Sequence, residues 1–199
     1  MTRKSNHCTL AAGMFASLLA AAFVLSGPGS AEAYNWVGAT NTATCSQLNM
    51  ADNASHNIYQ GGLRVDTVAA LTWARTNVVD PTNVNTNAVS TSTSTTDVIA
   101  VNNYYTNECG HNWASGVFGA VSCHSVTASG RCQQHYMRIN LTYMDSEGTS
   151  TERAVLAHEM GHTLGLAHRS ETYANMYPYW PQATAYWDSH DIGHINTNY

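Results

Sequence analysis

Two histidines and a glutamate near residue 160 have a spacing that suits metal chemistry. His158 and His162 are four residues apart, with Glu159 between them. At 3.6 residues per turn, both histidines project from one face of a helix, so their imidazoles can bind one cation. Gly165 can adopt the left-handed conformation that ends a helix, which lets His168 return as a third ligand. Three neutral imidazoles and a fourth position for water are typical of a catalytic zinc site.

Glu159 has a different role in this pattern. Consecutive helical side chains point about 100° apart, so Glu159 cannot easily bind the same ion as His158. It can reach the water on the ion, because zinc lowers the pKa of that water from about 9 towards about 7 and a nearby carboxylate can take the proton. The pattern indicates a hydrolase, and chance would place His-Glu-x-x-His in such a chain only about 0.015 times.

The residues around this motif resemble a known family. Residues 158–168 match the metzincin zinc-binding pattern, and residues 175–178, Asn-Met-Tyr-Pro, are similar to the Met-turn that follows it. Ser170, the Met-Tyr-Pro sequence and the tail 191–199 most resemble the matrixin catalytic domain. The motifs of this resemblance cover residues 158–199.

The resemblance implies a metzincin-like α/β (α+β) fold. The expected fold has a twisted, mostly parallel five-stranded sheet with one antiparallel edge strand, an active-site helix, and a small C-terminal subdomain after the zinc motif. The zinc ligands it implies are His158, His162 and His168. Glu159 becomes the general base, and Met176 packs beneath the single catalytic zinc without binding it. Matrixins also bind structural zinc or calcium, but no ligand pattern for these ions can be placed in residues 97–147.

The resemblance also predicts where a substrate would bind. In matrixin-like enzymes the substrate lies extended along the edge strand, here Gly116–Cys123, and the side chain after the scissile bond enters a pocket beside the Met-turn. The wall of that pocket is expected from Tyr177, Pro178, Tyr179 and Trp180. The alternative is that Tyr179 and Trp180 only pack the C-terminal subdomain, since aromatic residues often belong to cores.

These features predict a secreted zinc-dependent endopeptidase that hydrolyses peptide bonds with a zinc-bound water activated by Glu159. Its partners would be protein or peptide substrates, and we expect a monomer. The alternative is a non-catalytic secreted binding or adhesion module with a structural zinc on a metzincin scaffold, against which the intact Glu159 argues. A zinc hydrolase acting on other bonds is disfavoured by the resemblance. No separate pro-domain fits between Ala33 and the catalytic region.

Residues 1–33 have the features of a secretory signal peptide. Two basic residues near the start are followed by an apolar run, and residues 31–33, Ala-Glu-Ala, form a small-x-small cleavage sequence. The alternative is an uncleaved anchor, but the run is shorter than the roughly 20 residues that span a membrane. We expect a metallopeptidase catalytic domain of residues 34–199, secreted and extracellular, without membrane attachment.

The composition excludes nucleic acid as a partner. The chain has 8 Lys and Arg against 13 Asp and Glu, a net charge of −5, and no basic cluster beyond its N-terminus. Eleven Tyr, five Trp and three Phe supply a core, so one folded domain is expected. The histidines outside the zinc motif are expected to be surface or hydrogen-bonded side chains: His56, His111, His124, His135, His190 and His194.

Loss of residues 1–33 would remove Cys8 and leave four cysteines, an even number that suits two disulfides in a secreted protein. Of the three possible pairings we prefer Cys123–Cys132, which closes a short loop, together with Cys45–Cys109. The alternative is a zinc site built from Cys123, Cys132, His124 and His135.

Apolar periodicity predicts the remaining elements. Residues 34–62 should hold a loop and one strand, and residues 80–97, rich in Thr, Ser and Asn, a surface loop. Val65–Val78 has a helical face and is stopped by Pro81. Thr149 and Glu152 have the spacing of a capping box, so a helix should start near Ser150. The strand candidates are Asp97–Tyr105, Gly116–Cys123 and Tyr136–Met144.

Overall fold

The computed structural model describes residues 36–37, 48–108, 111–113, 116–181 and 184–199. The expected signal peptide, and the pair Cys45–Cys109, lie outside the described residues. Among the described residues, no helix has the length and apolarity needed to cross a bilayer. The elements in chain order are β1 (Ser55–Gly62), α1 (Val65–Ala74), the π-helical turn η1 (Arg75–Val79), β2 (Asn85–Val89), β3 (Val98–Asn103), β4 (Asn107–Glu108), β5 (His111–Asn112), β6 (Gly119–Val126), β7 (Cys132–Asn140), α2 (Leu141–Met144), α3 (Thr149–Leu164) and α4 (Ser189–Asn198).

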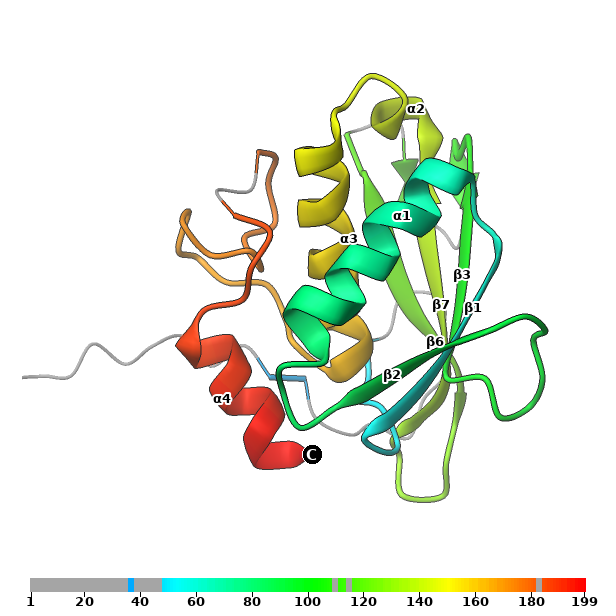
Figure 1. Ribbon diagram of the computed structural model, residues 1–199, viewed down its shortest axis with the longest axis vertical. Coiled ribbons are helices and arrows are strands. Elements are labelled where there is room, and N and C mark those ends of the chain that lie inside the picture. The colour runs from blue at the N-terminus through cyan, green and yellow to red at the C-terminus, as the bar shows by residue number, and fades with distance from the viewer. Residues whose placement is uncertain (1–35, 38–47, 109–110, 114–115, 182–183) are drawn as a thin grey trace, which may run out of the picture. The chain divides into compact units, whose positions relative to one another are not determined.

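The central sheet has five strands in the order β2-β1-β3-β7-β6. All neighbours pair in parallel except β6, which runs antiparallel to β7 and forms one edge. Helices α1 and α3 pack against each other over one face of the sheet, and the segment after α3 leads to α4 (Figure 1). The predicted mixed fold, with one antiparallel edge strand, is therefore confirmed.

The interior between the sheet and these helices is apolar. Ile58, Leu71, Met137 and Leu156 are fully buried in one cluster that joins β1, α1, β7 and α3. The predicted helix 65–78 is confirmed as α1 with η1, which ends at Val79, two residues before Pro81. The core thus fixes α3 against the sheet.

The prediction of a loop over residues 80–97 was wrong in part, because this segment contains β2. Asn85 and Thr86 pair in parallel with Ser55 and His56 of β1. The Nε of Arg75 donates to the hydroxyl of Thr86 at 3.1 Å. Backbone pairing at a sheet edge needs no apolar side chains, so composition alone did not reveal this strand.

The strand predicted over Tyr136–Met144 ends earlier than expected. The side chain of Asn140 accepts a hydrogen bond from the backbone N–H of Thr142 at 3.1 Å and caps α2, so β7 stops at Asn140. The alternating apolar pattern continues into Met144, but the last four residues form a helical turn. Side-chain capping outweighed the periodicity.

The helix that carries the zinc motif starts without the predicted capping box. The N-cap is Gly148, Thr149 already lies in α3, and Glu152 is buried instead of reaching back to the N-cap. At the other end Gly165 has a positive φ of 100°, and its conformation lets the N–H of Leu166 donate to the carbonyl of Gly161 at 3.0 Å. The predicted glycine stop is confirmed.

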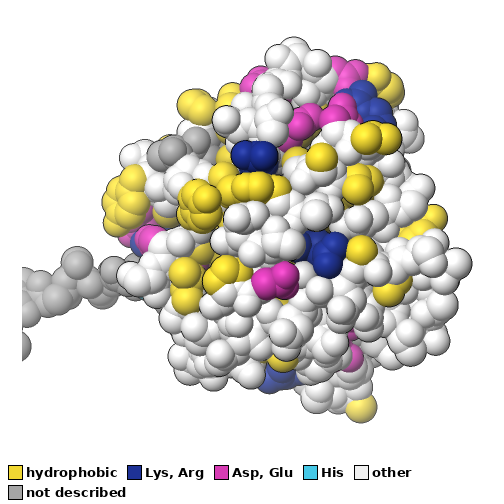
Figure 2. Space-filling view, in the orientation of Figure 1, with side chains coloured by type: hydrophobic (Ala, Val, Ile, Leu, Met, Phe, Trp, Pro, Cys, Tyr) yellow, Lys and Arg dark blue, Asp and Glu magenta, His cyan; other side chains and the backbone are white. Residues whose placement is uncertain are grey.

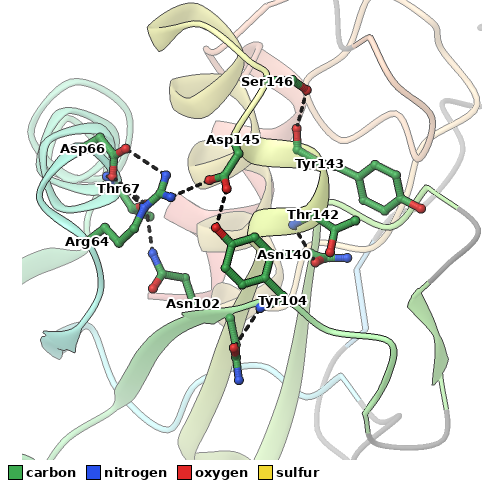
Figure 3. Close-up of polar contacts among 11 residues, drawn as sticks. Arg64, Asp66, Thr67, Asn102, Tyr104, Asn140, Thr142, Tyr143, Asp145 and Ser146 are labelled. Carbon is green, nitrogen blue, oxygen red and sulfur yellow. Dashed lines mark hydrogen bonds and ion pairs between the residues drawn. The ribbon is translucent and has the colours of Figure 1, made fainter.

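A polar network joins the start of α1 to the turn before α3 (Figure 3). Arg64 forms ion pairs with Asp66, at 2.9 Å, and with Asp145, whose other oxygen accepts from the hydroxyl of Tyr104 at 2.5 Å. The charged side chains are more than a third exposed. Water therefore screens these pairs, which orient the two segments more than they stabilise the core.

A disulfide joins Cys123 of β6 to Cys132 of β7, with the two Cα atoms 5.7 Å apart. The pairing expected from the short loop is thus present in the structure. Because both sulfurs are used in the bridge, the alternative zinc site with His124 and His135 is not formed. His124 is exposed, whereas His135 is buried and its Nε2 lies 2.9 Å from the carbonyl oxygen of Asn49.

Acid should destabilise the fold through two buried histidines. Burial lowers the pKa of His56 to about 3 and that of His135 to about 4, whereas in the unfolded chain both titrate near 6.5. Below pH 6.5 the unfolded state therefore binds protons that the folded state does not. Asp97 opposes this, because burial raises its pKa to about 6 and the folded state takes up its proton first. Two histidines outweigh one carboxyl, so these three groups together should lower the free energy of unfolding by roughly 2–4 kcal/mol between pH 7 and pH 4.

Urea unfolding across this pH range in His56→Gln measures the effect. The variant should lose less stability on acidification than the native chain, while His124→Gln, at an exposed position, should keep the native pH dependence. If the free energy of unfolding of His56→Gln falls with pH as steeply as that of the native chain, the lowered pKa assigned to His56 is wrong.

Candidate metal centre

Three histidine side chains meet at the C-terminal half of α3. His158 and His162 lie one turn apart on the helix, and the reversal at Gly165 brings His168 back to them. The Nε2 atoms of His158 and His162 are 3.0 Å apart, and those of His162 and His168 are 3.2 Å apart. The structure therefore brings together all three residues that the sequence proposed as ligands.

Two of these rings are held in one tautomer by backbone carbonyls. Nδ1 of His158 lies 2.7 Å from the carbonyl oxygen of Asn175, and Nδ1 of His162 lies 2.7 Å from that of Leu166. A carbonyl can only accept, so each Nδ1 must donate, and in the neutral ring each Nε2 keeps a free lone pair. Both lone pairs belong to the nitrogens that converge.

The electrostatics keep the three imidazoles neutral. Burial lowers the pKa of His158 to about 4 and that of His162 well below its ordinary value, and partial burial also lowers the pKa of His168. Neutral imidazoles are the form that binds a metal. Three converging imidazole nitrogens fit a divalent cation such as zinc.

Glu159 lies beside this triad with its carboxylate buried. It is 4% exposed, and no protein group donates to its Oε2 within the described residues. Burial raises the pKa of Glu159 to about 8, and a cation held by the histidines would favour the charged carboxylate again. This unpartnered, buried oxygen next to the triad can accept a hydrogen bond from a water molecule or from a substrate group.

The segment after α3 supports the triad from below. Met176 is fully buried, and a Cβ built on Gly161 of α3 would lie 2.6 Å from its Sδ. The amide of Asn175 donates to the carbonyl of Ala154 at 3.0 Å and to that of Thr184 at 2.9 Å. Met176 thus packs against the helix one residue from His162, which is compatible with the packing role that the resemblance implies.

The triad opens into a cavity of about 440 Å³. The cavity has three walls: the edge strand β6 with the residues before it, the helix α3, and the segment after the Met-turn. Pro178, Tyr179 and Trp180 line it, but Tyr177 does not and instead packs its ring on Tyr179. Of the four residues expected at the pocket, three therefore line it. Figure 2 shows hydrophobic side chains gathered over the C-terminal segment, at the left of the view, with charged side chains spread over the rest of this face.

Three residues of the site were not anticipated from the sequence. Gly119 of β6 lies against Glu159, and a glycine inside a strand pattern is the only hint of such a close approach. Asn175 holds His158 through its carbonyl, which carries no sequence signal. Arg169 directly follows His168 and is buried among carboxylates, two of which are distant in the chain.

A second group of metal-capable side chains lies at the start of α4, formed by Asp188, His190 and Asp191. Its carboxylates already form ion pairs with Arg169. Within the described residues, these two groups are the ones that could hold an ion. The structural zinc or calcium that matrixins also bind therefore gains no further group of this kind in this part of the chain.

Three neutral histidines and a glutamate, with a cavity above them, define a metallohydrolase type of centre. The chain matches the family model of the matrixins over residues 111–199. This match supports a matrixin-like catalytic domain with a metallopeptidase type of function, and the matrixin family implies a zinc cofactor for the histidine triad. No curated protein matches the chain.

Replacing Gly119 with Ala should impair Glu159 while sparing the metal. A Cβ at this position would lie 2.5 Å from Oε1 of Glu159 and 2.7 Å from its Cδ, so the carboxylate must move. We expect unchanged zinc content and a loss of peptide hydrolysis of about tenfold or more, against the roughly 10²–10⁴ that a general base contributes in full. Metal analysis and a peptide assay measure the two effects.

Gly193→Ala is the matched control, because a Cβ there meets no atom within 4 Å. It should keep both zinc and activity. Full activity in Gly119→Ala would show that Glu159 tolerates displacement and would contradict its assigned position.

Proposed function

We propose that the protein is a secreted zinc endopeptidase whose metal is held by His158, His162 and His168. One observation carries the proposal: three Nε2 atoms converge beside a buried carboxylate at the base of a cavity whose wall is an edge strand. The bound zinc supplies a Lewis acid that polarises the scissile carbonyl and lowers the pKa of the attacking water.

Glu159 acts as the general base in this proposal. Its unpartnered Oε2 accepts a proton from the attacking water, and the same oxygen returns the proton to the leaving amine. The hydrogen bonds from His158 and His162 to backbone carbonyls hold the rings in place during the reaction.

The edge strand β6 would bind the substrate backbone. One side of β6 pairs with β7, and its other side is an edge of the sheet. Residues from Gly116 to Val121 line the cavity, so an extended peptide can pair with this edge and present its carbonyl beside Glu159. Secretion is supported by the features of residues 1–33 and by the disulfide Cys123–Cys132, since disulfides persist in oxidising compartments.

Substitutions in the triad and at Glu159 should separate metal binding from catalysis. Alanine at His158, His162 or His168 should lower both zinc content and activity. Glu159→Ala should keep about one zinc and lose about 10²–10⁴ in rate. His124→Ala, at an exposed position, is the control and should change neither quantity. If purified Glu159→Ala digests peptides at the native rate, the mechanism is wrong.

Cleavage should favour large apolar or aromatic residues on the amine side of the cut. Trp180 is 36% exposed and its ring lies 5.5 Å from that of Phe118, so the two rings reach across from the C-terminal segment to the edge of the sheet. Burying a Leu- or Phe-sized side chain there contributes roughly 1.5–3 kcal/mol. A mass-spectrometric cleavage profile over a peptide library measures the preference.

Trp180→Ala should weaken this preference, and Tyr179→Ala should do so less, because Tyr179 is 68% exposed. Tyr173→Ala, an exposed aromatic outside the cavity, should leave the profile unchanged. Cuts dominated by Asp, Glu or Gly at this position would disprove the pocket assignment without affecting the zinc chemistry.

A further inference from the structure

The three histidines of the triad are not oriented in the same way. His158 and His162 each donate from Nδ1 to a backbone carbonyl. For His168, the described part of the chain offers no acceptor to Nδ1, and its side chain is the most exposed of the three. Apart from its contacts with the other two rings, its position therefore depends on the backbone that carries it.

That backbone is fixed at the next residue. The N–H of Arg169 donates to the carbonyl oxygen of Met176 at 2.9 Å, which ties the ligand loop to the Met-turn. The side chain of Arg169 is only 1% exposed, although it is charged. A buried guanidinium is costly unless carboxylates compensate it, so its partners decide where this loop can lie.

Three carboxylates surround the Arg169 guanidinium. Nε lies 3.2 Å from Oε2 of Glu171, and Nη1 lies 2.7 Å from Oδ2 of Asp188 and 3.5 Å from Oδ1 of Asp191. Glu171 belongs to the same loop, whereas Asp188 and Asp191 belong to the start of α4. The guanidinium thus connects the loop to a helix that follows later in the chain.

Asp188 is itself held rigidly. Its Oδ1 accepts from the backbone N–H groups of His190 and Asp191 and caps α4, while its Oδ2 accepts from Arg169. The carboxylate of Asp191 is fully buried. The two partners from the start of α4 are therefore fixed by the fold of that helix, and they hold the guanidinium in one place.

We propose that Arg169 is the positioning residue for His168, fixing the third metal ligand through the main chain, since no described residue accepts a hydrogen bond from the Nδ1 of His168. The inference rests on the proposed role of His168 as a ligand. Groups that orient metal ligands typically change metal affinity about 10–100-fold when they are removed. Arg169→Met, which keeps length but removes the charge, should therefore weaken zinc binding by about tenfold or more.

Zinc affinity is measured by competition with a chelating indicator on the purified protein, at a temperature where circular dichroism shows each variant to be folded. Arg169→Lys should fall between the native chain and Arg169→Met, because a point charge can satisfy some of the three carboxylates. Equal affinities for the Lys and Met variants would mean that only packing matters and would overturn the proposal. Arg64→Met, which breaks the exposed pairs with Asp66 and Asp145, is the control and should keep native affinity.

A double-mutant comparison separates positioning from a general loss of structure. If Arg169 acts through His168, Arg169→Met should change zinc affinity less than about twofold once His168 is already Ala. If Arg169→Met lowers zinc affinity by the same factor with His168 present and with His168→Ala, the proposal is overturned. Native zinc affinity in Arg169→Met would overturn it as well.

Asp188→Ser provides a variant for the case in which Arg169→Met fails to fold. Serine still caps α4 but cannot pair with the guanidinium, so zinc affinity should fall by a smaller factor of about three to ten. Native affinity in Asp188→Ser would then refute the proposal. These readouts need no peptide hydrolysis: a native chain that binds zinc tightly but digests nothing would refute the proposed function alone, and a native chain that binds no zinc would refute both.

Discussion

Two imidazole N–H groups buried on α3 each require an acceptor, and the fold of the chain after Gly165 depends on that requirement. Nearly every residue of the second half of α3 is buried, so water cannot supply the acceptors. Leu166 provides one carbonyl immediately after the glycine reversal, and Asn175 provides the other from a segment anchored to α3 through its own amide. The C-terminal subdomain is thus built around the hydrogen-bonding needs of two side chains.

The parts of the fold that depend on local patterns could be predicted from the sequence. The helix with His158 and His162, the stop at Gly165 and the alternation that marks β7 are encoded in short windows. The resemblance supplied the sheet and its antiparallel edge strand, which no window of this chain shows by itself. Both kinds of inference agree with the structure in these elements. The residues that the periodicity places on one face are also the residues that tertiary packing buries.

Other parts depend on contacts between distant residues and could not be predicted. The strand β2 has a polar sequence and exists because β1 offers it a ladder of hydrogen bonds. The capping box at Thr149 and Glu152 is not formed, since Glu152 is buried and Gly148 takes the N-cap. At the candidate site, the residues that were missed act through a carbonyl, a missing Cβ or a distant ion pair. Apart from the glycine inside the strand pattern, none of these leaves a local trace in the sequence.

The disulfide between β6 and β7 has a consequence for alignment within the sheet. An edge strand with one neighbour can slip by a residue, and a one-residue slip turns every side chain to the opposite face. The position that faces Glu159 tolerates only glycine without displacement, and Gly119 lies on the same strand as Cys123. The covalent link near the turn of the hairpin therefore opposes a slip out of the register that places Gly119, and not Phe118 or Ala120, opposite the carboxylate.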